Sequence, residues 1–110
     1  MHSEYTNNGS QVIVKLSGSI YVEDAAKLRE NLLSHIEQGH NNFLLDLEKV
    51  DYIDSSGLGV LVAINKRTLQ NRGKLIIKGI NGLVKELFEL TRLTKVFEIG
   101  ELSSQVRHFV

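Results

Sequence analysis

The sequence predicts a mixed α/β fold: a mixed β-sheet with an N-terminal antiparallel hairpin, remaining strands largely parallel, and about four helices. Two observations carry this prediction. A turn signal at Asn8-Gly9 precedes a strand of alternating hydrophobicity. After it, strand and helix patterns alternate along the chain, and strands separated by helices usually pair in parallel through right-handed crossovers. A chain of 110 residues suffices for one hydrophobic core, so we expect a single domain over residues 1–110.

Turn and capping residues mark the hairpin and the first helix. A two-residue turn at Asn8-Gly9 needs positive φ, which these residues accept. The strand over residues 11–16 stops at Ser17-Gly18. Its buried face is predicted to comprise Val12, Val14 and Leu16. Asp24 is the predicted N-cap of a helix that ends at Gly39. Apolar residues recur along that helix at helical spacing: Ala25, Leu28, Leu32 and Ile36.

The remaining elements alternate between strands and helices. Residues 43–47 form a short apolar run between polar residues, which is typical of a central strand. After a loop, a helix is expected from Asp54-Ser55-Ser56-Gly57 to about Asn71, closed by Gly73. Residues 74–78 and 96–99 are predicted strands. The third helix is indicated by Leu83, Val84, Leu87, Phe88 and Thr91, and a closing helix by Leu102, Val106 and Phe109.

The composition excludes several classes of protein. Lys and Arg total 13, as do Asp and Glu, so the formal net charge is zero. Nucleic-acid binding needs a concentrated positive field, which is missing. Without Cys there are neither disulfides nor thiolate metal sites, which suits a reducing compartment. Because the N-terminus is no signal peptide and no apolar run approaches a membrane span, we expect a cytoplasmic protein.

The tetrapeptide Asp54-Ser55-Ser56-Gly57 is the candidate functional site. It lies between the central strand and the start of a helix, where free backbone amides and the helix dipole favour an anion. A serine there is well placed to become phosphoserine. The alternative is plain N-capping, since Asp, Ser and Gly are residues that start helices.

The helix that follows is apolar on all sides over residues 58–64. A helix on the outside of a sheet buries one stripe, so the remaining apolar surface either meets a partner protein or is wedged between neighbouring helices. The small Gly57 near the cap would let a partner's backbone approach. The candidate partner contacts are Leu58, Gly59, Val60 and Val62. A buried strand is a weaker third interpretation, because Gly59 would interrupt it.

Patterns for enzyme sites are missing. Neither Ser55 nor Ser56 has the flanking glycines of a nucleophile elbow, and no P-loop follows Gly57. The four histidines are scattered along the sequence and expected to be exposed: His2, His35, His40 and His108. A magnesium cluster can be imagined from Asp46, Asp51 and Asp54, but a polar strand position and turn caps explain them more simply. We expect no catalytic residues, no metal and no cofactor.

Several motifs together resemble the STAS-domain family, specifically the bacterial anti-sigma factor antagonists. The resemblance rests on Leu45-Asp46-Leu47, on residues 50–59, which read Val-Asp-Tyr-Ile-Asp-Ser-Ser-Gly-Leu-Gly, and on Gly73-Lys74-Leu75. It continues through residues 87–93 and Val96-Phe97, so that element order and length agree over essentially the whole chain.

The resemblance implies a phosphorylation switch at Ser56. In this family the second serine of the block is phosphorylated by a partner that is both anti-sigma factor and serine kinase. The unphosphorylated antagonist binds that partner and frees the sigma factor, and a serine phosphatase resets the switch. By resemblance Ser56 is the acceptor and Ser55 the lesser candidate, with Asp54, Ser55 and Gly57 shaping the site.

One departure from the family pattern concerns the end of the second strand. Family members often carry a Gly-acid-Leu-Asp pattern there, whereas this chain reads Gly18-Ser19-Ile20-Tyr21, so both acids are missing. This puts a role of that loop in kinase docking or nucleotide contact in doubt, and makes Tyr21 a candidate contact to the chain's own partner.

Two alternative functions stay open on the sequence. A STAS module of another apparatus, such as a stress-signalling scaffold or a transport complex, would share the fold but bind a different partner. The other alternative is a protein that contacts ATP or GTP weakly, which the helix N-terminus at Ser56 suggests.

Overall fold

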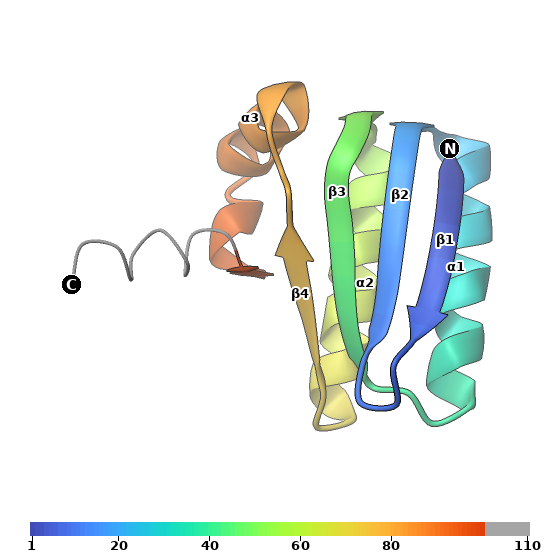
Figure 1. Ribbon diagram of the computed structural model, residues 1–110. Coiled ribbons are helices and arrows are strands. Elements are labelled where there is room, and N and C mark those ends of the chain that lie inside the picture. Colours follow the sequence, from blue (N-terminus) through green and yellow to red (C-terminus); the bar gives the residue numbers. More distant parts are fainter. Residues whose placement is uncertain (101–110) are drawn as a thin grey trace.

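In the computed structural model, which describes residues 1–100, five strands form one sheet and helices α1 and α2 lie behind it (Figure 1). The strands are β1 (His2–Asn7), β2 (Val12–Ile20), β3 (Asn42–Ile53), β4 (Lys74–Lys78) and β5 (Glu98–Ile99). The helices are α1 (Val22–Glu37), α2 (Ser55–Gln70), α3 (Gly82–Leu90) and a short 3-10 helix (Leu93–Lys95). Strand order is β1-β2-β3-β4-β5, with β1 antiparallel to β2 and the other pairs parallel. The predicted fold class is confirmed.

The N-terminal hairpin is confirmed, but its turn is longer than two residues. Asn7 pairs with Val12, which leaves a four-residue loop between the strands. The Asn8 side chain holds this loop, because its Oδ1 accepts hydrogen bonds from the backbone amides of Ser10 and Gln11. The prediction of a two-residue turn was wrong, because an Asn side chain can also stabilise a longer loop that contains the same turn residues. Gly9 keeps the positive φ that the motif predicted.

Helix α1 begins earlier than the sequence predicts. Its N-cap is Tyr21, and Asp24 is the third residue inside the helix rather than the cap. The Asp24 carboxylate accepts a hydrogen bond at 3.0 Å from the backbone amide of Tyr21, so it satisfies a free amide from within the first turn. Acidic residues are favourable both at the N-cap and in the first helical turn. The sequence pattern therefore placed the N-cap about one turn too late.

Acid is expected to remove part of the stability that Asp24 provides. The Tyr21 backbone amide, and then the α-amino group of Met1 at 3.5 Å, hold the pKa of Asp24 below its usual range. A carboxyl group whose pKa is lowered by folding stabilises the fold at pH values above its unfolded-state pKa of about 3.9. This contribution is lost as the pH falls through the folded-state pKa. Asp24→Asn should therefore unfold at a lower urea concentration than wild type at pH 7, and this difference should disappear once the pH falls below the lowered pKa of Asp24. The control Glu23→Gln removes a neighbouring exposed carboxyl, and an equal loss there would contradict this role of Asp24.

Strand β3 is longer than predicted, because the segment after Leu47 is strand rather than loop. The β2–β3 register shifts twice, and each shift inserts one extra residue into β3. The buried residues Leu47, Val50 and Ile53 are consequently three positions apart instead of two. A strand with this spacing has no regular alternation and resembles a loop in the sequence.

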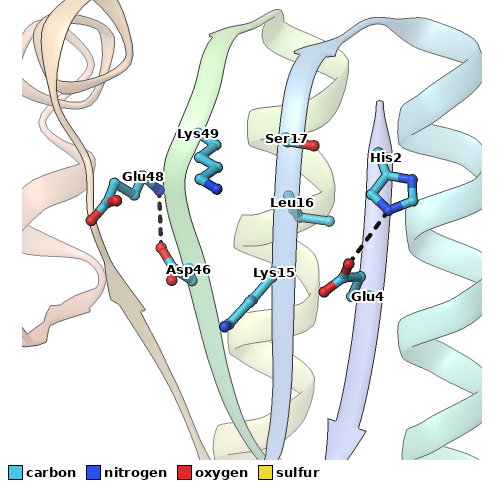
Figure 2. A pocket seen from close by; sticks show the side chains of 8 residues that line it. All are labelled: His2, Glu4, Lys15, Leu16, Ser17, Asp46, Glu48 and Lys49. Carbon is cyan, nitrogen blue, oxygen red and sulfur yellow. Dashed lines mark hydrogen bonds and ion pairs between the residues drawn. The ribbon is translucent and has the colours of Figure 1, made fainter.

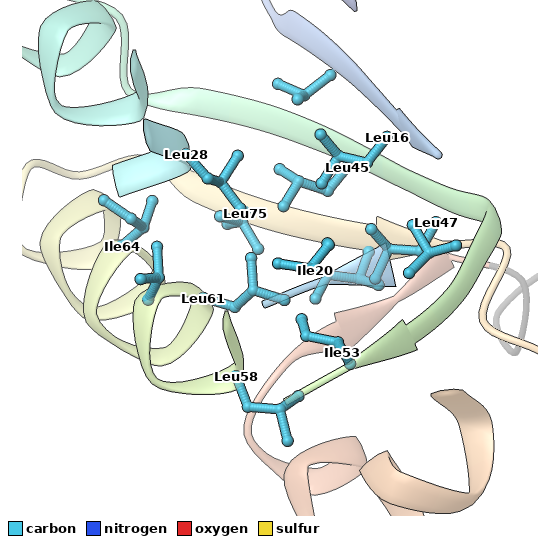
Figure 3. Close-up of a cluster of buried hydrophobic side chains, with 14 of the residues drawn as sticks. Leu16, Ile20, Leu28, Leu45, Leu47, Ile53, Leu58, Leu61, Ile64 and Leu75 are labelled. Carbon is cyan, nitrogen blue, oxygen red and sulfur yellow. The ribbon is translucent and has the colours of Figure 1, made fainter. Parts of the chain in front are cut away.

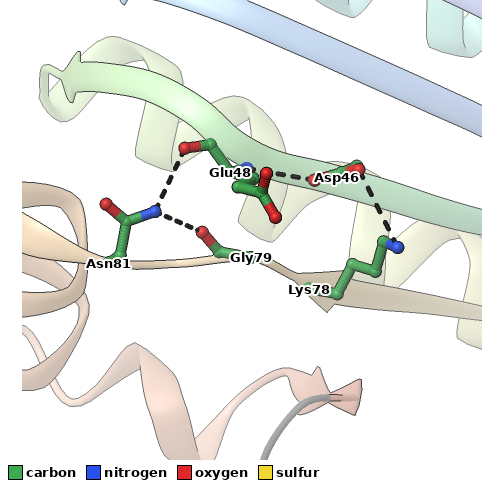
Figure 4. A network of polar contacts seen from close by, with 5 residues as sticks. All are labelled: Asp46, Glu48, Lys78, Gly79 and Asn81. Atoms are coloured by element: carbon green, nitrogen blue, oxygen red, sulfur yellow. Dashed lines mark hydrogen bonds and ion pairs between the residues drawn. The ribbon is translucent and has the colours of Figure 1, made fainter.

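A polar clasp secures the first of these irregularities and ties it to β4 (Figure 4). The Glu48 backbone amide donates to the Asp46 carboxylate at 3.0 Å. The Asn81 side chain donates to the Glu48 carbonyl at 3.1 Å and to the Gly79 carbonyl at 2.8 Å. Lys78 completes the clasp with its ammonium 3.8 Å from Asp46. Backbone groups displaced by the extra residue thereby regain partners.

The core lies between the sheet and the helices α1 and α2 (Figure 3). The predicted inward residues of β2 are all buried, as are three of the predicted apolar residues of α1, while Ile36 is half-buried. The largest fully buried side chains include Phe43, Leu45, Leu61, Leu75 and Ile77. Each such side chain contributes about 1.5–3 kcal/mol relative to an exposed one. This layer fixes the position of the α2 N-terminus.

The C-terminal part agrees with the prediction in order. Helix α3 buries Val84 and Phe88, and the Phe88 ring lies 5.8 Å from that of Phe97. The last strand begins only at Glu98. The predicted closing helix of Leu102, Val106 and Phe109 lies outside the described residues.

Candidate functional site

The candidate site is the first turn of α2, which is fixed to the ends of two strands. Asp54 is the N-cap, and its carboxylate accepts a hydrogen bond from the Gly57 amide at 3.1 Å. The Asp54 amide in turn donates to the Ile20 carbonyl at 3.1 Å, where β2 ends. Helix start, β3 end and β2 end therefore form one connected unit that presents the two serines in a defined orientation.

Gly57 brings this turn close to the sheet. A Cβ atom on Gly57 would lie 2.6 Å from Cγ1 of Ile53 and 3.0 Å from Cγ2 of Ile20. Such approaches are far inside van der Waals contact, so any larger residue would push the helix start away from the strands. The sequence indicated that Gly57 leaves room for a partner, whereas the structure shows it buried against the chain's own core.

Substituting the two glycines of this turn should give opposite results. Gly57→Ala is expected to lower the free energy of unfolding by about 1–3 kcal/mol through overpacking. Gly59→Ala is the matched control, because a Cβ there meets nothing within 4 Å and alanine favours helix by about 1 kcal/mol over glycine. Urea denaturation of both variants provides the measurement. Equal stability of the two would contradict the close approach at Gly57.

Ser55 is exposed and Ser56 is half-buried at this helix start. Within residues 1–100 the Ser56 hydroxyl has no hydrogen-bond partner. The neighbouring backbone amides and the positive end of the helix dipole favour a negative group at this place. A phosphate on Ser56 would thus be tolerated by the fold. N-capping, the alternative interpretation, accounts for Asp54 but leaves the Ser56 hydroxyl without a structural task.

The apolar stretch of α2 is largely covered by the protein itself. Leu58 and Val60 are each only 8% exposed, so they belong to the core and are not available as partner contacts. The expectation that both bind a partner is corrected for this reason. Asn65 of α2 donates to the Val96 carbonyl at 3.5 Å, while α1 packs along the opposite flank. A helix with neighbours on both flanks buries more than one stripe.

A stripe of small residues on α2 stays accessible. Gly59 and Ala63 are exposed and Val62 is half-buried. Ser56, Gly59 and Ala63 lie three and four residues apart, hence on one face of the helix. Sequence reasoning named Gly59 and Val62 but missed Ala63, because the pattern alone did not show which side faces the solvent.

Two tyrosines border the site. Tyr21 is 51% exposed and directly follows Ile20, whose carbonyl holds the Asp54 amide. Its ring lies 5.8 Å from that of Tyr52, the residue that pairs across from Ser19. The structure thus places Tyr21 next to the candidate site, and its role as a partner contact stays a prediction. It also adds Tyr52, which was hidden in a segment expected to be a loop.

Other chemistry-bearing residues lie elsewhere. A depression of about 360 Å³ on the sheet is lined by His2, Glu4, Lys15, Leu16, Ser17, Asp46, Glu48 and Lys49 (Figure 2), none of them a residue of the candidate site. His35 and His40 are not scattered, because their rings lie 5.9 Å apart, and His35 is half-buried against Tyr5. Residues 1–100 contain no group of three metal-ligating side chains. None of the described helices is long and apolar enough to cross a membrane.

Comparison with known proteins identifies the family. The STAS domain matches residues 2–107. The chain belongs to the STAS domain family. The anti-sigma-B factor antagonist of Staphylococcus aureus is 32% identical over 101 residues, which cover 92% of this chain and 94% of that protein. The family to which the sequence motifs pointed is thus confirmed.

Solved structures of other proteins share this fold. The crystal structure of the TM1081 protein from Thermotoga maritima is 26% identical with a TM-score of 0.84, covering 96% of this STAS chain and 94% of that chain. The Bacillus cell fate determinant SpoIIAA in its phosphorylated form is 17% identical with a TM-score of 0.73, covering 96% and 99%. SpoIIAA has also been solved unphosphorylated, with a TM-score of 0.74. The SpoIIAA likeness shows the fold alone.

Proposed function

We propose that this STAS protein is an anti-sigma factor antagonist controlled by phosphorylation at Ser56. Unphosphorylated, it binds an anti-sigma factor that is also a serine kinase and thereby releases the sigma factor. Phosphorylation ends that binding, and a serine phosphatase restores it. The switch acts in the cytoplasm, where sigma factors bind RNA polymerase, and the chain itself is a binding protein rather than an enzyme.

One observation carries the proposal. The Ser56 hydroxyl stands without a hydrogen-bond partner within residues 1–100, on a helix start fixed by the Asp54 cap and the Asp54–Ile20 bond. A kinase can bind such a hydroxyl without first breaking a hydrogen bond within the substrate protein. The 32% identity to the Staphylococcus aureus anti-sigma-B factor antagonist supports the partner class. Exposed Gly59 and Ala63 beside Ser56 offer a smooth surface for that partner.

Mapping the phosphate tests the proposal. A pull-down from the source organism should recover an anti-sigma factor with a kinase domain. Incubating the two proteins with ATP should add one phosphate, which mass spectrometry should locate on Ser56. Ser56→Ala should remove it and Ser55→Ala should keep it. Phosphate on Ser55 in wild type, or none at all with an active kinase, would contradict the assignment.

A further inference from the structure

The sheet face opposite α1 and α2 is not covered by a helix across β1, β2, β3 and β4 within residues 1–100 (Figure 1). Its middle carries a cross-strand row of three aliphatic side chains, Ile13, Leu44 and Ile76, which are neighbours in the β2–β3 and β3–β4 registers. All three are partly exposed. A row of aliphatic side chains facing solvent on a regular sheet is typical of a surface that meets another protein.

The next row on the same face consists of four charged residues of alternating sign. In the strand registers Glu4 pairs with Lys15, Lys15 with Asp46, and Asp46 with Lys78. Figure 2 shows the first three side by side on adjacent strands. Each also lines the depression of about 360 Å³. Because two acids and two bases alternate, this row has no excess charge that would select an anion or a cation.

An alternating row has another property, which is self-complementarity. Read in reverse, the order minus, plus, minus, plus becomes plus, minus, plus, minus. A second copy turned by a two-fold axis parallel to the strands, between β2 and β3, would place its β4 on β1 and its β3 on β2. Glu4 would then face Lys78 of the other copy, and Lys15 would face Asp46. A two-fold interface makes each such contact twice.

We infer that this face binds a second copy of the chain in a two-fold, sheet-to-sheet dimer. The same axis sets Ile13 against Leu44 of the other copy, so the apolar rows coincide when the charged rows do. Aligned packing of two sheets is a common arrangement with the sheets about 10 Å apart. Ser56 lies on α2 behind the sheet, so the dimer leaves the phosphorylation site accessible.

The size of the face makes the dimer weak. Four strands spaced ~4.8 Å apart, with about seven residues each at ~3.3 Å, present roughly 450 Å² per copy. This lies at the lower end of specific protein interfaces. The association should therefore be reversible and visible in the range of tens to hundreds of micromolar, rather than permanent.

A charge exchange between two variants tests the arrangement. Glu4→Lys alone places two positive pairs in the two-fold dimer, and Lys78→Glu alone places two negative pairs. Each should weaken the dimerisation Kd at least ~10-fold, since like charges across an interface are strongly unfavourable. An equimolar mixture should regain the wild-type Kd as a heterodimer, because the introduced lysine of one variant then faces the introduced glutamate of the other. Sedimentation velocity with one variant labelled measures the dimerisation Kd of each variant alone and of the mixture.

The controls separate this interface from general charge effects. Glu30→Lys and Lys66→Glu alter exposed residues of α1 and α2 on the other side of the sheet and should leave the Kd unchanged. Recovery in the mixture also shows that both variants are folded. The inference is overturned by a wild-type chain that stays monomeric up to ~1 mM. Variants that dimerise like wild type, or a mixture that fails to recover, overturn it equally.

Discussion

Phosphorylation of Ser56 is expected to weaken binding to the anti-sigma factor at least ~100-fold while leaving the fold intact. A phosphate adds about 1.5–2 negative charges beside the Asp54 carboxylate. Within the domain, the free amides and helix dipole offset part of this repulsion, by about 0.3–1 kcal/mol at an exposed terminus. The Asp54 cap and the Asp54–Ile20 bond hold the backbone of this helix start, so the added charge stays at the same place on the surface.

In the complex the phosphate would be pressed against a surface shaped for a hydroxyl and for the small Gly59 and Ala63. Removing an unpaired charge from water costs several kcal/mol, and ~3 kcal/mol already corresponds to more than a hundredfold in Kd. Desolvation thus outweighs the local gain from the helix dipole.

Calorimetry with unmodified and phosphorylated protein measures the change in affinity. Ser56→Ala should bind the partner as wild type does and resist the kinase. Ser56→Asp should bind poorly, although less so than phosphoserine because it carries less charge. Ser55→Ala is the matched control one residue away, and its phosphorylation should still release the partner. Equal affinity of the phosphorylated and unmodified forms would end the switch hypothesis.

Placing a large residue on the exposed stripe of α2 should abolish partner binding without unfolding the protein. Ala63→Arg introduces a long charged side chain at an exposed helical position, four residues beyond Gly59 and on the same face as Ser56. A partner that lies closely on small side chains would have to move away or bury the charge. We expect a loss of ~100-fold or more in affinity, and circular dichroism and urea stability close to wild type.

The matched control is Gln70→Arg, on the same face of the same helix but two turns further from Ser56. It should bind normally if the partner covers only the N-terminal half of α2. Leu58→Arg, in contrast, should fail to fold, because Leu58 is 8% exposed. Normal binding by Ala63→Arg would place the partner surface elsewhere.

Local patterns sufficed for most of the fold. The order of strands and helices, the hairpin at Asn8-Gly9 and the helix end at Gly39 follow from hydrophobic spacing and turn residues, which act within a few positions of the chain. Where two local solutions use the same residue types, the prediction failed. Asp24 suits the third helical position as well as the cap, and Asn8 suits a four-residue loop as well as a two-residue turn.

The candidate site, too, could be predicted only in part from the sequence. Capping depends on residues close together in the chain, so the start of a helix at residues 54–57 could be predicted before the fold was known. Which residues of the helix are buried could not be predicted in this way: Leu58 and Val60 lie in the core, while Gly59 and Ala63 are exposed. That choice depends on α1 and the Val96 segment, which lie far away in the sequence and cover both flanks of α2. Likewise, the irregular register of β3 placed Tyr52 beside Tyr21, since strand pairing rather than local spacing sets the position of each side chain.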